Sequence, residues 1–495
     1  MALHLAIDLG AGSGRAIIGS LGARGLVLQE VHRFVYPPRH VAGHLRWDMT
    51  RLFQGIRHGL ERATLEAAVL GRPLISMGVD SWGVDYALVD AAGRLVEEPI
   101  CYRDDRTAGI VDEVLSRVPR EELFARTGIQ LLPFNTLFQL AAHVRSGIPK
   151  DAARLLMIPD FCHQALCGST VTEYTNASTT QLLRSGERAW DDTLCEAIGF
   201  PRALLPDIVP AGDLLGTLDD RWQRDCGAGP LQVVAPATHD TGSAVAGTPL
   251  EPGWAYISSG TWSLVGVERT EPLLGEAVAR ANFTNEAGAF GTVRFLKNVT
   301  GLWILESCRR EWHGAGLRVP YQELLDRAAR TPGFVGFVYS DHPRFFNPAS
   351  MIDEVRAALA ETGQTPHRDP VLLTRVVLDS LALRYASVLR DIDEVSGCPV
   401  GGTHIVGGGS LNDYLNQATA DASGRPVLAG PVEATAIGNL AVQSIAAGEL
   451  SSLQDARRQL ATHVQLRRFE PSNVEKWAAA AARYRDLTPA LTTGA

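Results

Sequence analysis

Short apolar runs followed by glycine-rich turns recur along the chain. Residues 3–9 are mostly apolar, residues 10–14 read Gly-Ala-Gly-Ser-Gly, and residues 16–18 are apolar again. This pattern predicts a strand, a tight loop and a second strand. Residues 254–265 repeat it around Ser-Ser-Gly-Thr at 258–261. Two hairpins with the same pattern in a single chain predict a duplicated domain.

A third glycine-rich turn has a different continuation. Gly407, Gly408 and Gly409 follow the apolar run 403–406, and a helical pattern opened by Ser410 comes next. Because glycine has no side chain, a flat nucleobase or ribose could lie against the backbone at Gly408 or Gly409. The alternative interpretation is a turn at the start of the helix that requires a positive φ.

Elsewhere, segments with a strand-like hydrophobic pattern alternate with segments with a helix-like pattern, which predicts an α/β fold with central sheets. The strand-like runs are 74–79, 86–89, 231–235, 403–406 and 427–428, and the helix-like runs are 49–70, 106–117, 135–144, 301–312 and 371–395. Gly247–Gly253 breaks both periods, so the predicted domains are residues 1–248 and 249–485, followed by a frayed tail at 486–495.

Composition narrows the class of partner. The 495 residues include 46 basic and 55 acidic side chains, for a net charge of -9. This net negative charge provides no positive potential to attract nucleic acid, so we expect the protein to act on a small molecule. No run approaches the roughly 20 apolar residues of a membrane span, and the N-terminus does not read as a signal peptide. Seven cysteines without Cys-x-x-Cys spacing fit reduced thiols. These features predict a cytoplasmic protein that does not bind membranes.

The first hairpin loop is a candidate phosphate site. Lysine occurs only three times and never after glycine, so no P-loop is present. A dinucleotide fingerprint would need glycine where Arg15 stands and a helix where a strand is predicted, which weakens a nicotinamide dehydrogenase hypothesis. A glycine-rich backbone facing an anion remains, with Asp8 able to hold hydrated Mg²⁺ and Arg15 able to neutralise phosphate oxygens. A plain hairpin with a buried salt bridge is the alternative. Gly260 and Thr261 in the second hairpin could form a second phosphate clamp.

Asp240 is the candidate general base. It follows the predicted strand 231–235 and opens a small-residue helical run, a usual place for ligands in α/β folds. The helix end would favour its ionised form, which can accept a proton. A helix N-cap role is the alternative. The neighbouring His239 could bond a substrate or be a packed core histidine.

The segment Val-Asp-Ser-Trp-Gly-Val-Asp-Tyr at 79–86 has the composition of a sugar pocket. The Trp82 indole offers a face for C–H surface, while Asp80 and the backbone at Gly83 offer partners for hydroxyls. A hairpin with a core tryptophan is the alternative.

Taken together, these segments resemble the FGGY family of carbohydrate kinases, from about residue 4 to residue 480. The motifs that carry the resemblance are IDLGAGSGR (7–15), VDSWGVDY (79–86), PFNTLFQL (133–140), IPDF (158–161), EYTNASTTQL (173–182), ATHDTGSAV (237–245), SSGTWSLVG (258–266), NFTNE (282–286), FLKNVTGLW (295–303), RFFNP (344–348) and GPVEATAIGN (430–439).

The resemblance implies two ribonuclease-H-like domains of the actin/hexokinase type flanking a central cleft. It also implies ATP and Mg²⁺, with transfer of the γ-phosphoryl group to a sugar hydroxyl. NFTNE and FLKNVTGLW narrow the acceptor to O1 of L-rhamnulose, in L-rhamnose catabolism. L-Fuculose or L-xylulose would be the alternative acceptor, and a non-catalytic actin-like ATP sensor is the alternative of a different class. The expected partners are the sugar and ATP, with a monomer or weak homo-oligomer.

The resemblance also implies roles for individual residues. Asp240 becomes the general base, and Gly83 and His239 lie at the sugar. The nucleotide residues it implies are Ala11, Gly12, Ser13, Gly14, Arg15, Thr261, Asn298 and one of Gly408 or Gly409. Two departures stand out: Glu306 occupies a nucleotide position where the family often has Gln, and Ala-Gly-Ser-Gly replaces Ser-Ser-Gly in the first loop.

Overall fold

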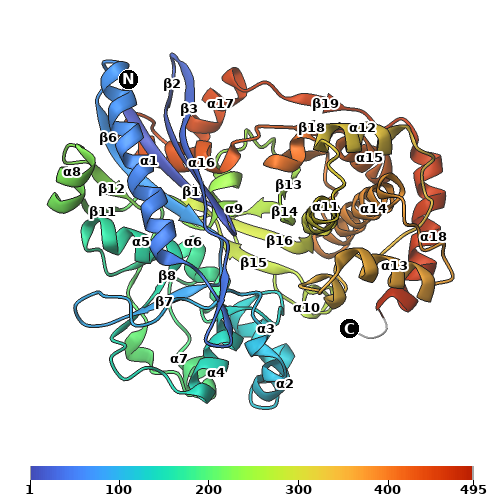
Figure 1. Cartoon of the computed structure of the whole chain (residues 1–495), viewed down its shortest axis with the longest axis horizontal. Coiled ribbons are helices and arrows are strands. Elements are labelled where there is room, and N and C mark those ends of the chain that lie inside the picture. Colours follow the sequence, from blue (N-terminus) through green and yellow to red (C-terminus); the bar gives the residue numbers. More distant parts are fainter. Residues whose placement is uncertain (1, 493–495) are drawn as a thin grey trace. The chain divides into compact units, whose positions relative to one another are not determined.

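The computed structural model describes residues 2–492, which form two compact units (Figure 1). The first unit comprises Met1–Pro249, Glu268–Phe295 and Ala434–Val464, and the second comprises Leu250–Val267, Leu296–Glu433 and Gln465–Ala495. The division expected after residue 248 lies beside the first crossing between the units. Two later segments return to the first unit, which a single linear boundary does not provide.

The first unit is built on a six-stranded sheet of order β11-β12-β6-β1-β2-β3. Its strands are β1 (Leu3–Leu9), β2 (Ser13–Gly22), β3 (Gly25–Val35), β6 (Leu74–Ser81), β11 (Leu214–Thr217) and β12 (Gln232–Val234). β1, β2 and β3 are antiparallel neighbours, whereas β6 is parallel to both β1 and β12. The carboxyl ends of β1, β6 and β12 therefore meet at one edge, where the candidate acidic residues follow.

Two helices cover opposite faces of this sheet. α1 (Met49–Val69) brings Gly59 against Ala16 and Ile7. α16 (Ala434–Ala446) packs Leu440 with Ala6 and Ile17. Because successive residues of a strand point to opposite faces, contacts to Ile7 and to Ala6 place the two helices on different sides. The two helices come from distant parts of the sequence, as the blue of α1 and the orange-red of α16 in Figure 1 show.

A separate apolar core of the first unit includes Phe138, Leu155 and Trp190. The remaining elements of the unit are β4 (Arg39–Val41), β5 (His44–Arg46), β7 (Tyr86–Val89), α2 (Ile110–Leu115), α3 (Arg120–Thr127), α4 (Thr136–Ser146), β8 (Arg154–Met157), α5 (Ile158–Cys167), β9 (Thr172–Glu173), α6 (Tyr174–Ala177), α7 (Asp192–Ile198), β10 (Ile208–Val209), α8 (Asp220–Cys226), α9 (Asp240–Ala246), α10 (Glu276–Arg280), β15 (Thr284–Ala287) and α17 (Leu453–His463).

The second unit repeats the topology of the first. Its strands are β13 (Ala255–Ser259), β14 (Trp262–Arg269), β16 (Val293–Thr300), β17 (Thr403–Val406), β18 (Val427–Ala429) and β19 (Arg467–Phe469). They form a seven-stranded sheet of order β15-β16-β14-β13-β17-β18-β19, whose edge strand β15 is the short strand already given above. β13 is antiparallel to β14 and parallel to β17, and β19 closes the edge in antiparallel fashion, as β11 does in the first unit. The predicted duplication is confirmed.

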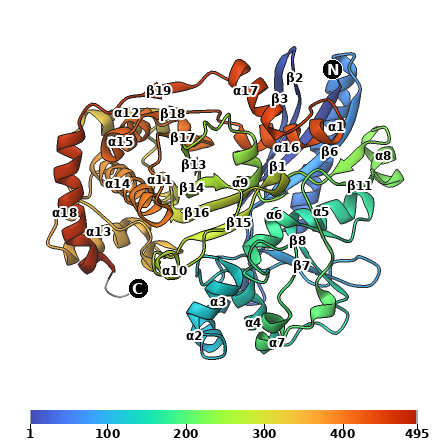
Figure 2. The same ribbon diagram turned by 180° about the vertical axis from the view of Figure 1, so that it is seen from behind.

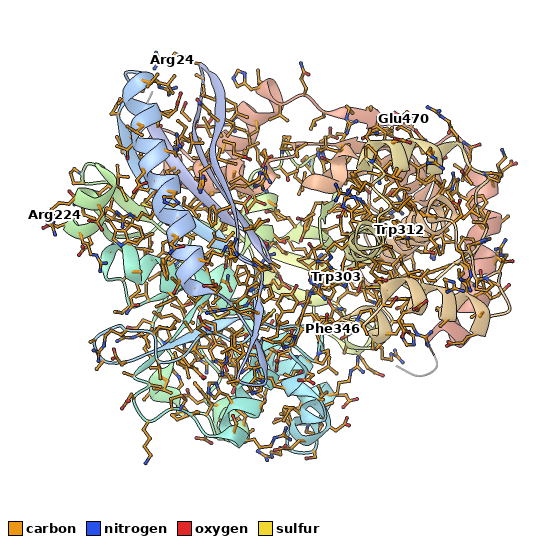
Figure 3. The ribbon with its side chains drawn as sticks, viewed as in Figure 1. Arg24, Arg224, Trp303, Trp312, Phe346 and Glu470 are labelled. Atoms are coloured by element: carbon orange, nitrogen blue, oxygen red, sulfur yellow. The ribbon has the colours of Figure 1, made fainter. Side chains whose placement is uncertain are left out.

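Long helices make up most of the rest of the second unit. They are α11 (Trp303–Gly314), α12 (Tyr321–Arg330), α13 (Met351–Glu361), α14 (Pro370–Ser396), α15 (Asp413–Ser423) and α18 (Val474–Thr492). α14 is buried among α11, α12, α15 and α18, and α18 lies at the outer edge of the second unit (Figures 1 and 2). Charged residues such as Arg24, Arg224 and Glu470 lie at the surface, whereas Trp312 is buried (Figure 3).

Two local expectations, the cap of α15 and the frayed tail, differ from the structure. Asn412, not Ser410, caps α15, because its side chain accepts from Leu415 N while Ser410 bonds back to Gly407. The described part of the expected frayed tail, residues 486–492, continues α18, and residues 493–495 lie outside the described residues. All seven cysteines are free. Within residues 2–492, no helix is both long and apolar enough to cross a membrane.

Candidate active site

Three aspartates gather at the edge where the parallel strands of the first unit end. Asp8 on β1 and Asp80 on β6 are direct register partners, and Asp240 is the first residue of α9, shortly after β12. Burial and the neighbouring Asp8 raise the pKa of Asp80 well above the usual carboxyl range. The charges of Asp8 and Asp240 both reach the phenol of Tyr36, whose pKa is raised first by burial and then by them. These acids share one electrostatic environment.

Tyr36 stabilises the loop that follows β1. The Tyr36 hydroxyl donates to the carbonyl of Gly10 at 2.6 Å and lies 3.1 Å from that of Ser13. Gly12 has φ +122°, a conformation that favours glycine. Ala11 and Ser13 are exposed and Gly14 is buried against Phe34.

The two charged residues beside this loop pair with each other. Arg15 donates to the Asp8 carboxylate, whose side chain is only 7% exposed. The salt bridge of the alternative interpretation is therefore present. It does not exclude a phosphate site, because the guanidinium has further donors and is 22% exposed.

Asp240 is not the N-cap of its helix. His239 occupies that position, and the Asp240 carboxylate accepts from the Thr241 backbone at 2.6 Å and from its hydroxyl at 3.2 Å. Burial by the surrounding protein is the main reason why the pKa of Asp240 is raised, although 31% of its side chain is exposed. The expectation that the helix end favours the charged form is thus outweighed by desolvation. A carboxyl that is exposed, weakly acidic and hydrogen-bonded on one side can act as a base.

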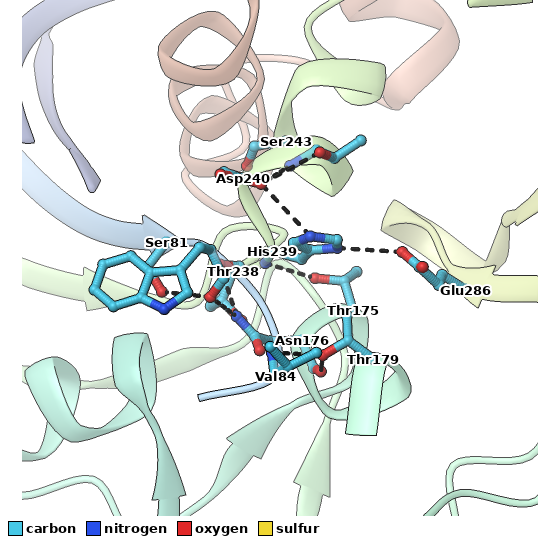
Figure 4. Close-up of polar contacts among 12 residues, drawn as sticks. Ser81, Val84, Thr175, Asn176, Thr179, Thr238, His239, Asp240, Ser243 and Glu286 are labelled. Atoms are coloured by element: carbon cyan, nitrogen blue, oxygen red, sulfur yellow. Dashed lines mark hydrogen bonds and ion pairs between the residues drawn. The ribbon is translucent and has the colours of Figure 1, made fainter. Parts of the chain in front are cut away.

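His239 lies between Asp240 and Glu286 (Figure 4), and Glu286 belongs to a buried ion pair with Arg294. Arg294 Nη2 donates to His239 Nδ1 at 2.9 Å, and Glu286 lies 3.2 Å from the same guanidinium. Glu286 Oε2 also lies 3.4 Å from Nδ1, so both members of the ion pair hold this side of the ring. On the other side, Nε2 is 3.5 Å from Asp240 Oδ1. His239 is therefore held in position beside the candidate base, which favours the substrate-side interpretation over simple core packing.

The structure corrects the expected sugar contact of Asp80. Its side chain is fully buried and accepts from Asn439 of α16 at 2.5 Å. An atom without exposed surface cannot touch a substrate, so Asp80 supports the neighbouring strands instead. Trp82 is only 6% exposed, and its indole N–H donates to Asp85 at 3.0 Å, beside the Trp47 indole at 2.7 Å. The core-tryptophan interpretation accounts for most of Trp82.

Gly83 remains partly exposed, and its lack of a side chain has a packing reason. A Cβ there would lie 2.9 Å from Thr179 Oγ1. The next residue, Val84, has φ +68°, which is unfavourable for a β-branched residue. Thr179 and Thr136 hold its backbone by hydrogen bonds of 3.0 and 2.7 Å. A strained, tightly held turn beside a candidate sugar contact is typical of functional sites, and no sequence pattern predicts it.

Other contributors were missed because they come from distant segments. Tyr36, Arg294 and Asn439 each fix a candidate residue, but none stands near it in sequence. A buried charge such as Arg294, fully enclosed in the structure, could have been suspected only from its position in an apolar strand pattern.

In the second unit, the β13–β14 loop is bound to the start of α11. Gly260 accepts from Leu302 N at 3.0 Å, and Thr261 accepts from Gly301 N at 3.2 Å. Thr261 is exposed, and a Cβ at Gly260 would have only Trp262 O nearby, at 3.8 Å. The loop therefore presents an open backbone edge.

The three glycines after β17 have different reasons to be glycine. Gly407 has φ +78°. A Cβ at Gly409 would collide with Ser259, at 2.0 Å from its Oγ, while a Cβ at Gly408 would meet nothing within 4 Å. Packing explains Gly409, and Gly408 is the one with an open face.

The last two nucleotide candidates lie close to each other along the chain. Asn298 on β16 is half-buried. Both Glu306 carboxylate oxygens accept from Arg309 at 2.8 Å, and the side chain is 44% exposed. Its charge is engaged within α11, so a nucleotide contact at Glu306 would compete with this pair.

The candidate ligands suit a Mg²⁺ ion that binds together with nucleotide phosphates better than a Mg²⁺ ion held by protein side chains alone. Among the residues that the structure describes, no group of three or more His, Cys, Asp or Glu side chains could hold a metal. Mg²⁺ commonly binds through one or two carboxylates, waters and substrate phosphates. Asp8, beside the glycine-rich loop, fits that role as a single carboxylate.

Comparison with known proteins defines the class. Two models of the FGGY family of carbohydrate kinases match, the N-terminal domain over residues 3–247 and the C-terminal domain over residues 255–447. The chain belongs to the FGGY family of carbohydrate kinases, and it is a sugar kinase of that two-domain fold.

Particular relatives narrow this further. The chain is 40% identical to a rhamnulokinase of Bacteroides thetaiotaomicron over 97% of this chain and 98% of that one. It is 42% identical to a rhamnulokinase of Pectobacterium carotovorum, over 98% and 96% of the two chains. A rhamnulokinase of Bacillus subtilis is 38% identical, over 96% of each.

Solved structures support the fold. A ligand-bound xylulose kinase from Lactobacillus acidophilus superposes with a TM-score of 0.81 at 14% identity, covering 100% of this chain and 99% of that one. Plasmodium falciparum glycerol kinase with ADP gives 0.75 at 15% identity, covering 99% and 98%. At such identity these likenesses concern the fold alone.

Proposed function

We propose that this protein transfers the γ-phosphoryl group of ATP to O1 of L-rhamnulose, giving L-rhamnulose 1-phosphate and ADP. The observation that carries the proposal is the near-full-length identity of 38–42% to relatives named rhamnulokinase. The partly exposed Asp240 beside His239 would supply the base that such a transfer needs. ATP is supplied in the cytoplasm, where we expect the enzyme to act.

Asp240 would take the proton from the attacking hydroxyl. Burial raises the pKa of Asp240, which makes its carboxylate a stronger proton acceptor, and general bases contribute roughly 10²–10⁴-fold to such steps. His239 Nε2–H would donate to a sugar oxygen on the same side. Gly83, with its rigid neighbour Val84, would offer backbone groups to the sugar.

The remaining work is positioning and neutralisation of charge, as in phosphoryl transfer generally. The backbone of residues 11–14 and the Arg15 guanidinium would bind phosphate oxygens in the first unit. Asp8 would hold Mg²⁺, which neutralises phosphate charge when bound with ATP. In the second unit Gly260, Thr261, Asn298 and the open face of Gly408 are the proposed nucleotide contacts.

A ketose panel tests the substrate. ADP release should require both Mg²⁺ and sugar, and L-rhamnulose should give the highest kcat/KM among L-rhamnulose, L-fuculose and L-xylulose. A tenfold preference for either of the other sugars would overturn the substrate assignment and leave the kinase class intact. Absence of any sugar-dependent turnover would favour a non-catalytic ATP sensor.

A further inference from the structure

A short helical segment of the first unit is rich in hydroxyl side chains. It consists of α6 and the 3₁₀ turn η2 (Ser178–Thr180), and it belongs to the motif EYTNASTTQL at 173–182. None of its residues is a candidate contact for the sugar or for ATP. The side chains of Thr175, Ser178 and Thr179 are at most 6% exposed. An effect of these residues on a substrate must therefore pass through other residues.

The hydroxyls of Thr175, Ser178 and Thr179 lie on one face of this segment, because side chains three and four positions apart are neighbours on a helix. Ser178 Oγ donates to Thr175 O at 2.8 Å. Thr179 Oγ1 donates to Asn176 O at 2.8 Å, and Thr175 Oγ1 donates to the Glu173 carboxylate. Each hydroxyl proton is thus held close to the segment itself, and each oxygen can still accept from an N–H group elsewhere.

Thr179 holds the turn that contains Gly83. Its Oγ1 accepts from Val84 N at 3.0 Å (Figure 4), and a Cβ at Gly83 would lie only 2.9 Å from the same oxygen. Val84 has a φ of +68°, a conformation that persists only where surrounding groups enforce it. Thr179 therefore helps to decide where the backbone of Gly83 lies.

Thr175 and Ser178 hold two segments that meet at His239. Thr175 Oγ1 accepts from His239 N at 3.1 Å (Figure 4). Ser178 Oγ accepts from Ala287 N at 2.9 Å. The residue before Ala287 is Glu286, whose carboxylate lies 3.4 Å from His239 Nδ1. The same helical face thus fixes both the backbone of His239 and the strand that contacts its ring.

Thr180 shows that this pattern is not shared by every hydroxyl of the segment. Its side chain is fully buried. Its Oγ1 donates to Ala177 O at 2.6 Å and accepts from Leu182 N at 3.2 Å, so both partners are close to it in sequence. The next position along a helix lies on a different face. The contacts with distant segments therefore belong to the face formed by residues 175, 178 and 179.

We propose that α6 and η2 form a positioning element for the sugar, in which Thr175, Ser178 and Thr179 hold Gly83 and His239 at the separation that the substrate requires. This inference rests on the proposed function, because it takes Gly83 and His239 as sugar contacts. The three hydroxyl residues are positioning residues, since they reach the sugar only through the groups that they hold.

Thr179→Val and Thr175→Val test the element, because each keeps the size of the side chain and removes the hydroxyl. We expect each variant to lower kcat/KM for the sugar about tenfold, while the KM for ATP stays within about twofold of wild type. Thr179→Ser, which keeps the hydroxyl, should recover most of the loss. Steady-state kinetics on the full chain measures these constants, with the ketose that the wild type prefers.

Thr180→Val is the matched control, since it makes the same chemical change at a buried position of the same turn. It should leave kcat/KM for the sugar within about twofold of wild type, even where its thermal midpoint falls as far as that of Thr179→Val. Equal losses of kcat/KM in the two variants would show that the segment acts only through stability and would overturn the proposal. An unchanged kcat/KM in folded Thr179→Val, or no recovery in Thr179→Ser, would do the same.

Ser178→Ala gives an independent test if a valine variant does not fold, because it removes a single oxygen atom. It should also lower kcat/KM for the sugar and spare the KM for ATP, and an unchanged kcat/KM would overturn the proposal. The wild type separates this inference from the proposed function. Absence of sugar-dependent turnover in the wild type would overturn both, whereas normal turnover with unaffected variants would overturn the positioning element alone.

Discussion

Exposure separates the three aspartates at the end of the first sheet. Asp8 is paired with Arg15, and Asp80 is fully enclosed with Asn439. Asp240 alone among the three keeps 31% of its side chain exposed and sits beside the Nε2 of His239. Only Asp240 can receive a proton from a substrate hydroxyl without rearrangement.

Asp240→Asn should lower kcat by roughly 10²–10⁴ and leave sugar and ATP binding within a few-fold of wild type. The amide keeps the size of the side chain but cannot take the proton. A coupled assay gives the rate and calorimetry gives the affinities.

Since His239 is the N-cap, the variant removes no cap from α9, and the folded state should survive. Circular dichroism checks this. A kcat within threefold of wild type, on folded protein, would remove Asp240 from the mechanism.

Gly260→Val should raise the KM for ATP far more than the KM for sugar. The structure leaves room for a side chain there, with the nearest atom to a Cβ at 3.8 Å, so the fold should be kept and only a close ligand would be obstructed. Steady-state kinetics with each substrate varied measures the two constants. Parallel increases in both would mean that the loop acts only as structure.

Strand β6 is anchored by side chains from helices on both sides. His163 of α5 accepts from the backbone N–H of Val79 at 3.0 Å. On the other side, Gln443 of α16 donates to Leu5 O at 3.0 Å and accepts from Ser76 at 2.6 Å. These buried bonds fix β6 and its neighbour β1, and thereby the edge that carries the candidate site.

Acid should destabilise the first unit through His163. Burial lowers its pKa from 6.5 to about 3, so below pH 6.5 the unfolded chain binds a proton that the folded chain excludes, and stability falls as pH drops towards 3. At pH 5.5 this amounts to about 1.4 kcal/mol relative to pH 7.5.

His163→Gln keeps an acceptor for Val79 but cannot titrate. Urea unfolding at the two pH values should therefore show a smaller loss in the variant, by about that 1.4 kcal/mol. The mutation of His58, a histidine for which no such burial holds, to Gln serves as control. An unchanged pH dependence in His163→Gln would contradict the argument.

The compact units do not follow the order of the chain. The chain leaves the first unit after Phe295 and returns at Ala434, where α16 buries Ile437 and Leu440 on the sheet. Each such side chain contributes about 1.5–3 kcal/mol when fully buried. Against a usual net stability of about 5–15 kcal/mol, the loss of this helix is decisive.

A fragment of residues 1–249 should therefore not fold, although it spans a whole family-model match. We expect a non-cooperative urea transition and strong binding of a hydrophobic dye, with the intact chain as reference. A cooperative transition in the fragment would show that α16 and the segment Glu268–Phe295 are dispensable to the first unit.

Local patterns determined much of this protein. The two hairpins, the strand before Asp240 and the long helix at 370–396 all follow from periodicity and glycine placement, because neighbours in sequence decide turns and amphipathic faces. The family motifs added the class of reaction.

Tertiary structure alone decided which polar residues are accessible. Asp80 and Asp240 are alike in sequence, yet one is enclosed by α16 and the other faces outward. His239 is held by Arg294, which lies 55 residues away in the sequence. Burial and hydrogen bonding depend on which distant segments meet, and no local pattern carries that information.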